Sequence, residues 1–110
     1  MSITKVEQTR VLNDQLRQNL SLGTAIITRG VAALGVEAVA RFVQTIAVYD
    51  DFCHANDPYE EHDFGAFEAD GHNIFFKIDY YDKALMEHSP DPTNPLVTER
   101  VITIMLAEEY

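Results

Sequence analysis

Apolar residues near the start of the chain recur at the spacing of one helix face. They are Val6, Leu12, Leu16 and Leu20. Thr4 and Glu7 have the spacing of a capping box, which marks a helix start, and Gly23 offers a stop. The pattern therefore predicts a helix over residues 5–21.

Two further elements are predicted in the first half of the chain. The β-branched run TAIITR, bounded by Gly23 and Gly30, is too short for a typical helix and predicts a strand over residues 24–29. A broad apolar stripe after Gly35 predicts a second helix. The residues of this stripe are Val36, Val39, Phe42, Val43, Ile46 and Tyr49.

The middle of the chain predicts a loop followed by a β-hairpin. Residues 50–61 are polar and rich in turn formers, so we interpret them as a loop. Aromatic and β-branched runs over residues 62–69 and 72–81 flank Asp70-Gly71, a dipeptide suited to a two-residue turn with positive φ. With these turn residues, cross-strand partners have residue numbers that sum to 141.

This register gives the hairpin an apolar face and a mixed face. The face expected to meet the core contains Phe67, Ile74, Phe76, Ile78 and Tyr80. The mixed face contains His62, Phe64, Glu68, Phe75, Lys77, Asp79 and Tyr81. Its aromatic residues form either a contact surface or, under a covering helix, more core. A bulge at Gly65 would shift the register.

The sequence of the C-terminal third predicts its secondary structure less decisively. Pro90, Pro92 and Pro95 predict a loop, in which Asn94 and Pro95 resemble a helix cap and first helical residue. Residues 97–109 then predict a buried helix, although VITIML also fits a strand. We expect one α+β domain over residues 1–110, in the order αβαββα, with three helices against a small three-stranded, largely antiparallel sheet.

Composition excludes several classes of protein. The longest apolar stretches are too short to cross a bilayer, and no secretory signal is visible at the N-terminus. Cys53 is the single cysteine, which excludes an internal disulfide and suits a reducing compartment. We therefore expect a cytoplasmic protein without membrane contact.

Negative charge is concentrated in the middle of the chain. The formal net charge is −10; residues 1–49 carry +2, residues 50–91 carry −10 and residues 92–110 carry −2. Each phosphate contact needs a cation, so the acidic segment disfavours direct nucleic-acid binding and favours a basic protein surface or a cation. The alternative is a solvated surface that only keeps the protein soluble.

A polar cluster in the loop offers nitrogen and oxygen ligands without a metal signature. It consists of His54, Asp57, Glu60, Glu61, His62 and Asp63. The spacing matches neither HExxH nor an EF-hand, so we expect a polar loop with no metal and no cofactor. Cys53 beside His54 suggests a thiolate nucleophile, yet such an isolated cysteine is more often a small core residue.

The hairpin register also supplies a catalytic hypothesis. It places His62 opposite Asp79, as a base beside an orienting carboxylate, with Lys77 or Tyr81 as an acid or electrostatic partner. A cross-strand pair of this kind is more often a local stabilising contact. The enzyme alternative is therefore a small hydrolytic or metal-dependent enzyme centred on His62, Asp63 and Asp79, assisted by Lys77.

The sequence strings EHDFG, KIDYYD and TIMLAEEY, with TRGVAAL from Thr28 and LND from Leu12, carry a resemblance to a known family. Over about residues 8–110 the chain resembles the bacterial family called domain of unknown function 3768. Family members often have tryptophan before the lysine, where Phe76 keeps an aromatic ring. The resemblance implies the αβαββα order and an association with mobile elements, and conveys no established activity. It implies a family pattern at His62, Asp63, Gly65, Lys77, Asp79, Tyr80, Tyr81 and Asp82.

Together these observations predict a small acidic binding or regulatory protein rather than an enzyme. Its partner would be a basic protein surface, and one form of this function is a nucleic-acid mimic or, by analogy with mobile elements, a factor that counters host defence. The residues predicted to bind the partner are Asp57, Glu60, Glu61, Phe64, Glu68, Phe75, Tyr81 and Asp82.

Overall fold

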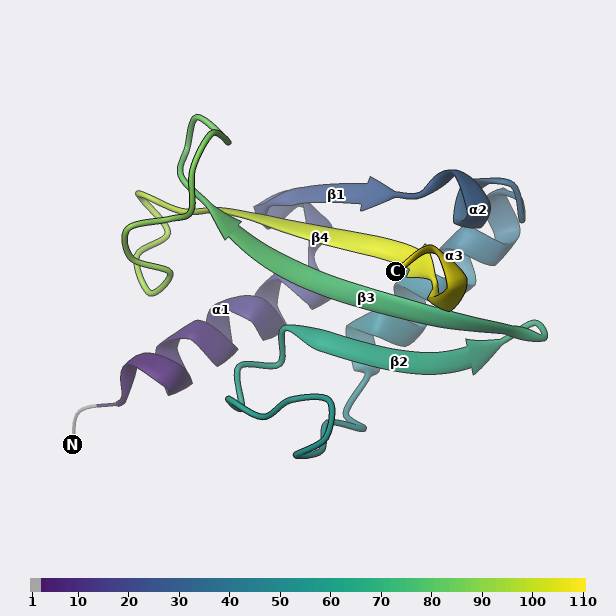
Figure 1. Cartoon of the computed structure of the whole chain (residues 1–110), viewed down its shortest axis with the longest axis horizontal. Coiled ribbons are helices and arrows are strands. Elements are labelled where there is room, and N and C mark those ends of the chain that lie inside the picture. The colour runs from purple at the N-terminus through teal and green to yellow at the C-terminus, as the bar shows by residue number, and fades with distance from the viewer. Residues whose placement is uncertain (1–2) are drawn as a thin grey trace.

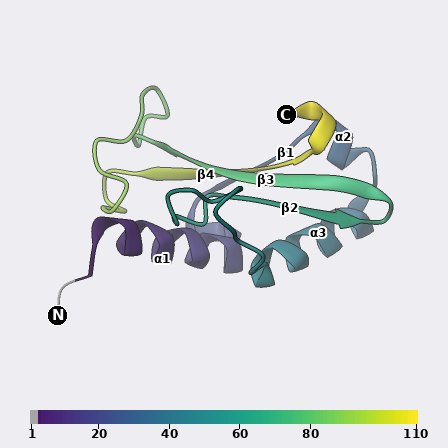
Figure 2. The ribbon, with the colours of Figure 1, turned by 60° about the horizontal axis from the view of Figure 1, so that its bottom comes forward.

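The protein is a two-layer α+β domain in which two long helices cover one face of a sheet (Figures 1 and 2). The computed structural model describes residues 3–110. The elements are α1 (Lys5–Gln18), a 3-10 turn (Leu20–Leu22), β1 (Thr24–Ile27), α2 (Arg29–Ala32), α3 (Val36–Val48), β2 (Phe64–Ala69), β3 (His72–Tyr81), β4 (Glu99–Leu106) and a C-terminal 3-10 turn (Ala107–Glu109). Within residues 3–110, no helix combines the length and apolar character needed to cross a membrane.

The sheet has four strands in the order β1-β4-β3-β2. β1 runs parallel to β4, whereas β4 pairs antiparallel with β3 and β3 pairs antiparallel with β2. The α+β class is confirmed, but the predicted three-stranded, largely antiparallel sheet is wrong in strand number and omits the parallel pair.

The strand that the sequence-based prediction omitted is β4, in the segment whose apolar pattern favoured a helix. Residues 99–106 form β4, and the four side chains Val101, Ile102, Ile104 and Met105 are all at least 95% buried. A strand buried on both faces has no alternation of apolar and polar residues, so its apolar run does not distinguish it from a buried helix. Asn94 caps a turn rather than a helix, accepting a hydrogen bond from the Leu96 amide at 2.9 Å.

The first helix begins as predicted and ends earlier. The Thr4 hydroxyl accepts a hydrogen bond from the Glu7 amide at 3.1 Å, which is half of the expected capping box. The helix ends at Gln18 instead of residue 21, because the Asn19 side chain caps a separate 3-10 turn by accepting from the Ser21 amide at 3.2 Å. The short helix α2 was not predicted.

The hairpin has the predicted turn and register. Asp70 and Gly71 have φ values of 54° and 78°, as a two-residue turn of this type requires. Phe64 pairs with Lys77, Gly65 with Phe76 and Phe67 with Ile74, so partner numbers sum to 141 and Gly65 forms no bulge. Arg41 of α3 pairs with Asp70 at 2.5 Å and ties the turn to the helical layer.

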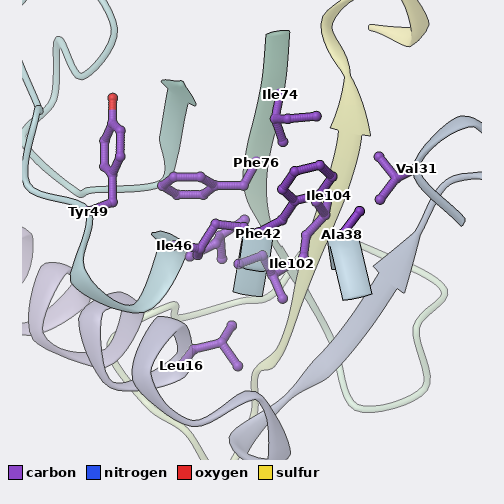
Figure 3. Close-up of a cluster of buried hydrophobic side chains, with 11 residues drawn as sticks. Leu16, Val31, Ala38, Phe42, Ile46, Tyr49, Ile74, Phe76, Ile102 and Ile104 are labelled. Atoms are coloured by element: carbon purple, nitrogen blue, oxygen red, sulfur yellow. The ribbon is translucent and has the colours of Figure 1, made fainter. Parts of the chain in front are cut away.

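The core lies between α1, α3 and the inner face of the sheet (Figure 3). Phe42 and Ile46 of α3 meet Phe76 of β3 and Ile104 of β4, and all four are at most 1% exposed. Ile74, Phe76 and Ile78 are buried, which confirms the predicted apolar face of the hairpin. Among residues 3–110, no long helix lies on the other face of the sheet (Figure 2).

Gly65 is expected to be intolerant of a side chain. A Cβ atom there would overlap the Phe76 ring and approach Tyr49 Cε1 to 2.7 Å. Both rings belong to the core, so neither is free to move. Gly65→Ala should therefore lower the free energy of unfolding by about 1–3 kcal/mol, measured by urea denaturation. A change below about 0.5 kcal/mol would contradict the steric explanation.

Candidate functional site

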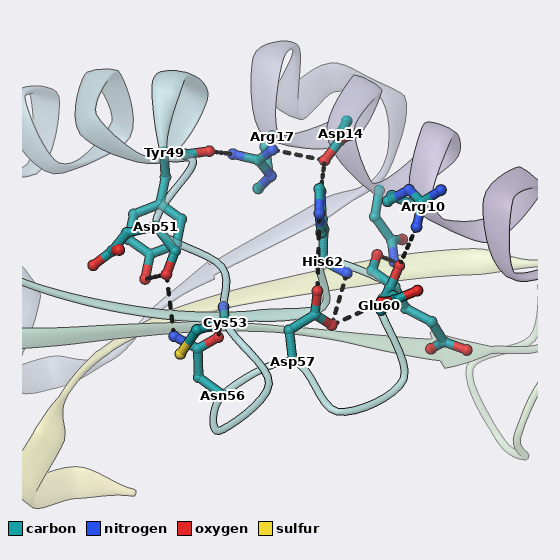
Figure 4. A network of polar contacts seen from close by, with 12 residues as sticks. Arg10, Asp14, Arg17, Tyr49, Asp51, Cys53, Asn56, Asp57, Glu60 and His62 are labelled. Carbon is teal, nitrogen blue, oxygen red and sulfur yellow. Dashed lines mark hydrogen bonds and ion pairs between the residues drawn. The ribbon is translucent and has the colours of Figure 1, made fainter.

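His62 joins the loop after α3 to helix α1 (Figure 4). Its Nδ1 lies 2.9 Å from Asp14 Oδ1, and because a carboxylate only accepts, His62 is the donor. Its Nε2 lies 3.8 Å from Asp57 Oδ2, and its ring stacks on Phe52 with 3.8 Å between ring centroids. Arg17 donates to the same Asp14 oxygen at 2.6 Å. The imidazole is therefore held between two carboxylates as a link between loop and helix.

A tight turn closed by Asp57 puts His62 in this position. The Asp57 carboxylate accepts hydrogen bonds from the backbone amides of Glu61 and His62, at 3.0 and 3.1 Å. Glu60 and His62 have positive φ values of 59° and 58°, so the chain turns away from the sheet there. The Ile78 amide still donates to the Asp63 carbonyl, at 2.8 Å, but the strand pairing goes no further.

The predicted pairing of His62 with Asp79 is therefore wrong. His62 contacts Asp14, whereas Asp79 pairs with Lys77, with 3.1 Å between Oδ2 and Nζ. The predicted register holds from Phe64 to Ala69, but it does not extend to His62, whose own backbone has a positive φ. The catalytic hypothesis loses the contact on which it depended.

The hollow beside His62 is polar. It has a volume of about 320 Å³ and is lined by Arg10, Phe52, Cys53, His54, Asp57, Glu60 and His62. Among residues 3–110, no three His, Cys, Asp or Glu side chains gather in an arrangement suited to a metal ion. Cys53 is exposed rather than a core residue, which corrects the expectation from its sequence context.

A buried polar network lies next to this link. Asn13 is fully buried, and its amide donates to the Glu61 carbonyl at 2.9 Å and to the Tyr80 hydroxyl at 2.7 Å. Arg100 Nε donates to Asn13 Oδ1 at 2.8 Å, and its guanidinium lies 5.1 Å from the centre of the Tyr80 ring. Burial raises the pKa of Tyr80 and lowers the pKa of Arg100. The network thus holds α1, the loop and two strands together.

The outer face of the sheet, opposite α1 and α3, carries a cluster of three aromatic rings. Phe64 and Phe75 lie 5.1 Å apart by ring centroids, and Tyr110 lies 5.9 and 5.8 Å from them. Tyr110 is 75% exposed. The sequence left open whether Phe64 and Phe75 are covered by a helix, and the C-terminal segment instead forms β4 and a short turn beside them. These three rings therefore form a partly exposed group, which we call the aromatic cluster.

An open hollow lies next to the aromatic cluster. It has a volume of about 450 Å³ and is lined by Ala55, Asn56, Asp63, Phe64, Lys77, Ile78, Asp79 and Tyr110. Burial and the charges of Glu61, Asp57 and Asp79 raise the pKa of Asp63. Lys77 is paired with Asp79, and no ion pair among residues 3–110 includes Asp63. We call this feature the acidic hollow.

Three of the other residues predicted to bind a partner, Asp57, Glu61 and Asp82, have structural roles. Asp57 is only 4% exposed, so its prediction as a contact residue is wrong. Glu61 accepts a hydrogen bond from the Tyr80 hydroxyl at 3.0 Å, and Asp82 accepts from the Met86 amide at 3.0 Å. Glu60, Glu68 and Tyr81 are exposed. Asp57 and Asp82 therefore close turns, which are roles typical of a polar loop.

Sequence reasoning missed Tyr110 and the α1 side chains. Asn13 and Arg17 are four residues apart on the buried face of α1, and polar residues in register with Leu16 were the available signal. Tyr110 had no such signal, because its position depends on Glu109. The Glu109 carboxylate accepts from the Thr28 hydroxyl at 2.6 Å and from the Gly30 amide at 3.0 Å, which fixes the turn before Tyr110.

Comparison with known proteins identifies a family. A family described as protein of unknown function (DUF3768) matches residues 27–109, which is well over half of the chain. The match begins at the end of β1, later than the resemblance noted from residue 8, and includes the loop, the hairpin and β4. No curated protein and no solved structure matches the chain. The chain belongs to the DUF3768 family of proteins of unknown function.

Proposed function

We propose that this protein binds a basic protein partner and receives a lysine or arginine side chain in the acidic hollow. The observation that carries the proposal is Asp63, a half-buried carboxylate whose pKa is raised by burial and by the negative charges of Glu61, Asp57 and Asp79. Nothing within residues 3–110 neutralises Asp63 in an ion pair. An incoming cation would supply the missing charge.

The aromatic cluster supports the same kind of ligand. Phe64 and Tyr110 line the hollow, and a cation over an aromatic face gains about 0.5–2 kcal/mol. A guanidinium or ammonium side chain can contact these rings while its charge faces Asp63 and Asp79. The methylene groups of the same side chain can pack on Phe75. The hollow therefore combines the two features that suit a basic side chain.

The charge of the molecule favours a protein partner over direct contact with nucleic acid. Residues 50–91 carry a net charge of −10, and phosphates would be repelled by it. A basic surface would be attracted over distances of about a Debye length, roughly 8 Å at physiological ionic strength. If that surface normally binds nucleic acid, the protein would compete with nucleic acid for it, which is the mimicry expected from the sequence.

A hexa-arginine peptide is a direct probe of the hollow. Titrated into the labelled protein, it should shift the backbone amide resonances of Phe64, Lys77 and Tyr110, and binding should weaken at least tenfold between about 0.05 and 0.5 M salt. A hexa-glutamine peptide controls for peptide binding without charge. Shifts spread over the whole acidic segment, with none concentrated at the hollow, would reject the proposal.

Two equally exposed tyrosines make a matched pair of variants. Tyr110 and Tyr59 are both 75% exposed, but only Tyr110 lines the hollow. Tyr110→Ala should weaken hexa-arginine binding about threefold or more, because it removes one aromatic face worth on the order of 1 kcal/mol. Tyr59→Ala should leave binding unchanged. An equal loss in both variants would show that the cluster is not the contact.

We expect Asp63 to lower the stability of the folded protein while it contributes to the binding of a basic partner. Its pKa is raised in the folded state, so ionised Asp63 opposes folding once the pH exceeds the carboxyl pKa of the unfolded chain. Asp63→Asn should therefore raise the melting temperature at pH 7 and have little effect below pH 3, while it weakens hexa-arginine binding. Asp50→Asn removes the same charge from an exposed site outside the hollow and should change neither property. A lower melting temperature for Asp63→Asn at pH 7 would contradict this account.

A further inference from the structure

The two edges of the sheet differ in how they are protected. At the β2 edge, the Tyr49 hydroxyl donates to the Ala66 carbonyl at 3.1 Å and is 3.2 Å from the Ala66 amide, from which it accepts. A side chain therefore occupies the backbone groups that another strand would need. At the β1 edge, Ala25, Ile26 and Ile27 are exposed, and β1 is the outermost strand (Figure 1). Ile26 is 46% exposed.

The register of β1 shows which backbone groups face outward. Thr24 pairs with Val101 and Ile26 with Thr103 in a parallel ladder, and the Thr28 amide donates to the Ile104 carbonyl at 3.1 Å. In a parallel pair, alternate residues of a strand bond to the neighbour. The even-numbered residues of β1 therefore bond to β4. Ala25 and Ile27 direct their N–H and C=O groups to the open edge.

These outward groups are self-complementary. In an antiparallel arrangement about a twofold axis through Ile26, Ala25 of one copy faces Ile27 of the other, and each such pair exchanges two backbone hydrogen bonds. The two Ile26 residues then face each other as a pair without mutual hydrogen bonds, and their exposed side chains cover one another. Four hydrogen bonds form between the copies.

The charge distribution favours a second copy at this edge. Thr24, Ala25, Ile26 and Ile27 are uncharged, and β1 belongs to the half of the chain with a net charge of +2. The acidic segment of residues 50–91 supplies β2 and β3, on the far side of β4 from β1. Pairing through β1 keeps the two acidic segments apart, whereas pairing through β2 would bring them together.

We propose that two copies of this chain associate through β1 to form a continuous eight-stranded sheet. The two outer faces then lie on the same side of one sheet, and the two acidic hollows lie toward its opposite ends. A four-residue strand contact is small compared with the roughly 800 Å² per partner of a typical stable interface. The dimer is therefore reversible and depends on protein concentration. The proposal is independent of what the acidic hollow binds.

Disulfide formation across the twofold axis tests the arrangement. Facing residues without mutual hydrogen bonds have Cα atoms about 4.5 Å apart, within the range that a disulfide spans. In a Cys53→Ser background, which removes the exposed native thiol, Ile26→Cys should form a covalent dimer with oxidised glutathione. Val36→Cys is the control, because Val36 is 87% exposed but lies outside β1. The Ile26→Cys protein should cross-link at least tenfold faster. Equal rates would overturn the proposal.

A second measurement does not depend on cysteine. The mass of the native chain in sedimentation equilibrium should rise from one copy toward two as the concentration increases to the millimolar range. Ile26→Lys places two like charges opposite each other and should raise the dissociation constant at least tenfold, whereas Val36→Lys should not. Circular dichroism of each variant confirms the fold. A mass of one copy at every concentration, or an unchanged constant in Ile26→Lys, would overturn the proposal.

Discussion

Replacing Phe76 with alanine should lower the free energy of unfolding by about 3–5 kcal/mol. Phe76 is fully buried in the centre of β3, and its ring meets Tyr49 edge-to-face with 5.3 Å between centroids. The Arg17 guanidinium lies 6.0 Å from the same ring. The cavity left by the ring would border the core and the link to α1, so few neighbours can move to fill it. Urea denaturation followed by circular dichroism measures the change.

The same site offers a test of mechanism through Gly65. Gly65 has no side chain because the Phe76 ring occupies the space. Gly65→Ala should therefore cost less in the Phe76→Ala background than in the native chain, by about 1 kcal/mol or more in a double-mutant cycle. Strict additivity of the two changes would mean that the glycine is required for another reason. Phe75→Ala provides the control background, because it removes a phenylalanine on the outer face of the sheet. The cost of Gly65→Ala should be the same in this background as in the native chain.

The hairpin was predictable because its determinants are local. The turn requires two residues with positive φ, and Asp70-Gly71 supplies them. Once the turn is fixed, the two-residue period of a strand determines which side chains meet the core. The pairing of Phe67 with Ile74 and the burial of Phe76 followed directly. No information from distant parts of the chain was needed.

The central strand was not predictable for a physical reason. The side chains of β4 are buried on both faces of the sheet, with Val101 and Met105 on one face and Ile102 and Ile104 on the other, so its apolar residues show no period of two. Only its pairing with other strands, with β3 and with β1 about eighty residues earlier in the chain, distinguishes it from a helix. The parallel pair was missed with it, because both depend on the same long-range contact.

The sequence identified several residues of the candidate site, but it did not predict how most of them are arranged in space. Phe64 and Phe75 were expected on one face together, and they are. His62 was expected on that face and is held by Asp14 of α1 instead, since Asp57 closes a turn that ends the register. The hollow depends on Tyr110, which reaches Phe64 only because the C-terminal turn folds back onto the sheet. These contacts are tertiary and leave no periodic signal.

Asn13→Ala should lower the free energy of unfolding by about 3 kcal/mol or more, a large effect for one amide group. The Asn13 side chain is fully buried and makes three hydrogen bonds, to Glu61, Tyr80 and Arg100. Alanine would leave the Arg100 Nε–H and the Glu61 carbonyl without partners in a buried site. Burial already lowers the pKa of Arg100, so the site tolerates its charge only with good acceptors.

Gln15→Ala provides the matched control, because Gln15 is exposed on the same helix and alanine favours helices. It should change the free energy of unfolding by less than about 0.5 kcal/mol. The Arg100 Nε–H resonance gives a second readout, since it should shift in Asn13→Ala and stay in place in Gln15→Ala. A loss below about 1 kcal/mol in Asn13→Ala would mean that water replaces the amide without strain. The network would then position α1, the loop and the sheet without contributing much of their stability.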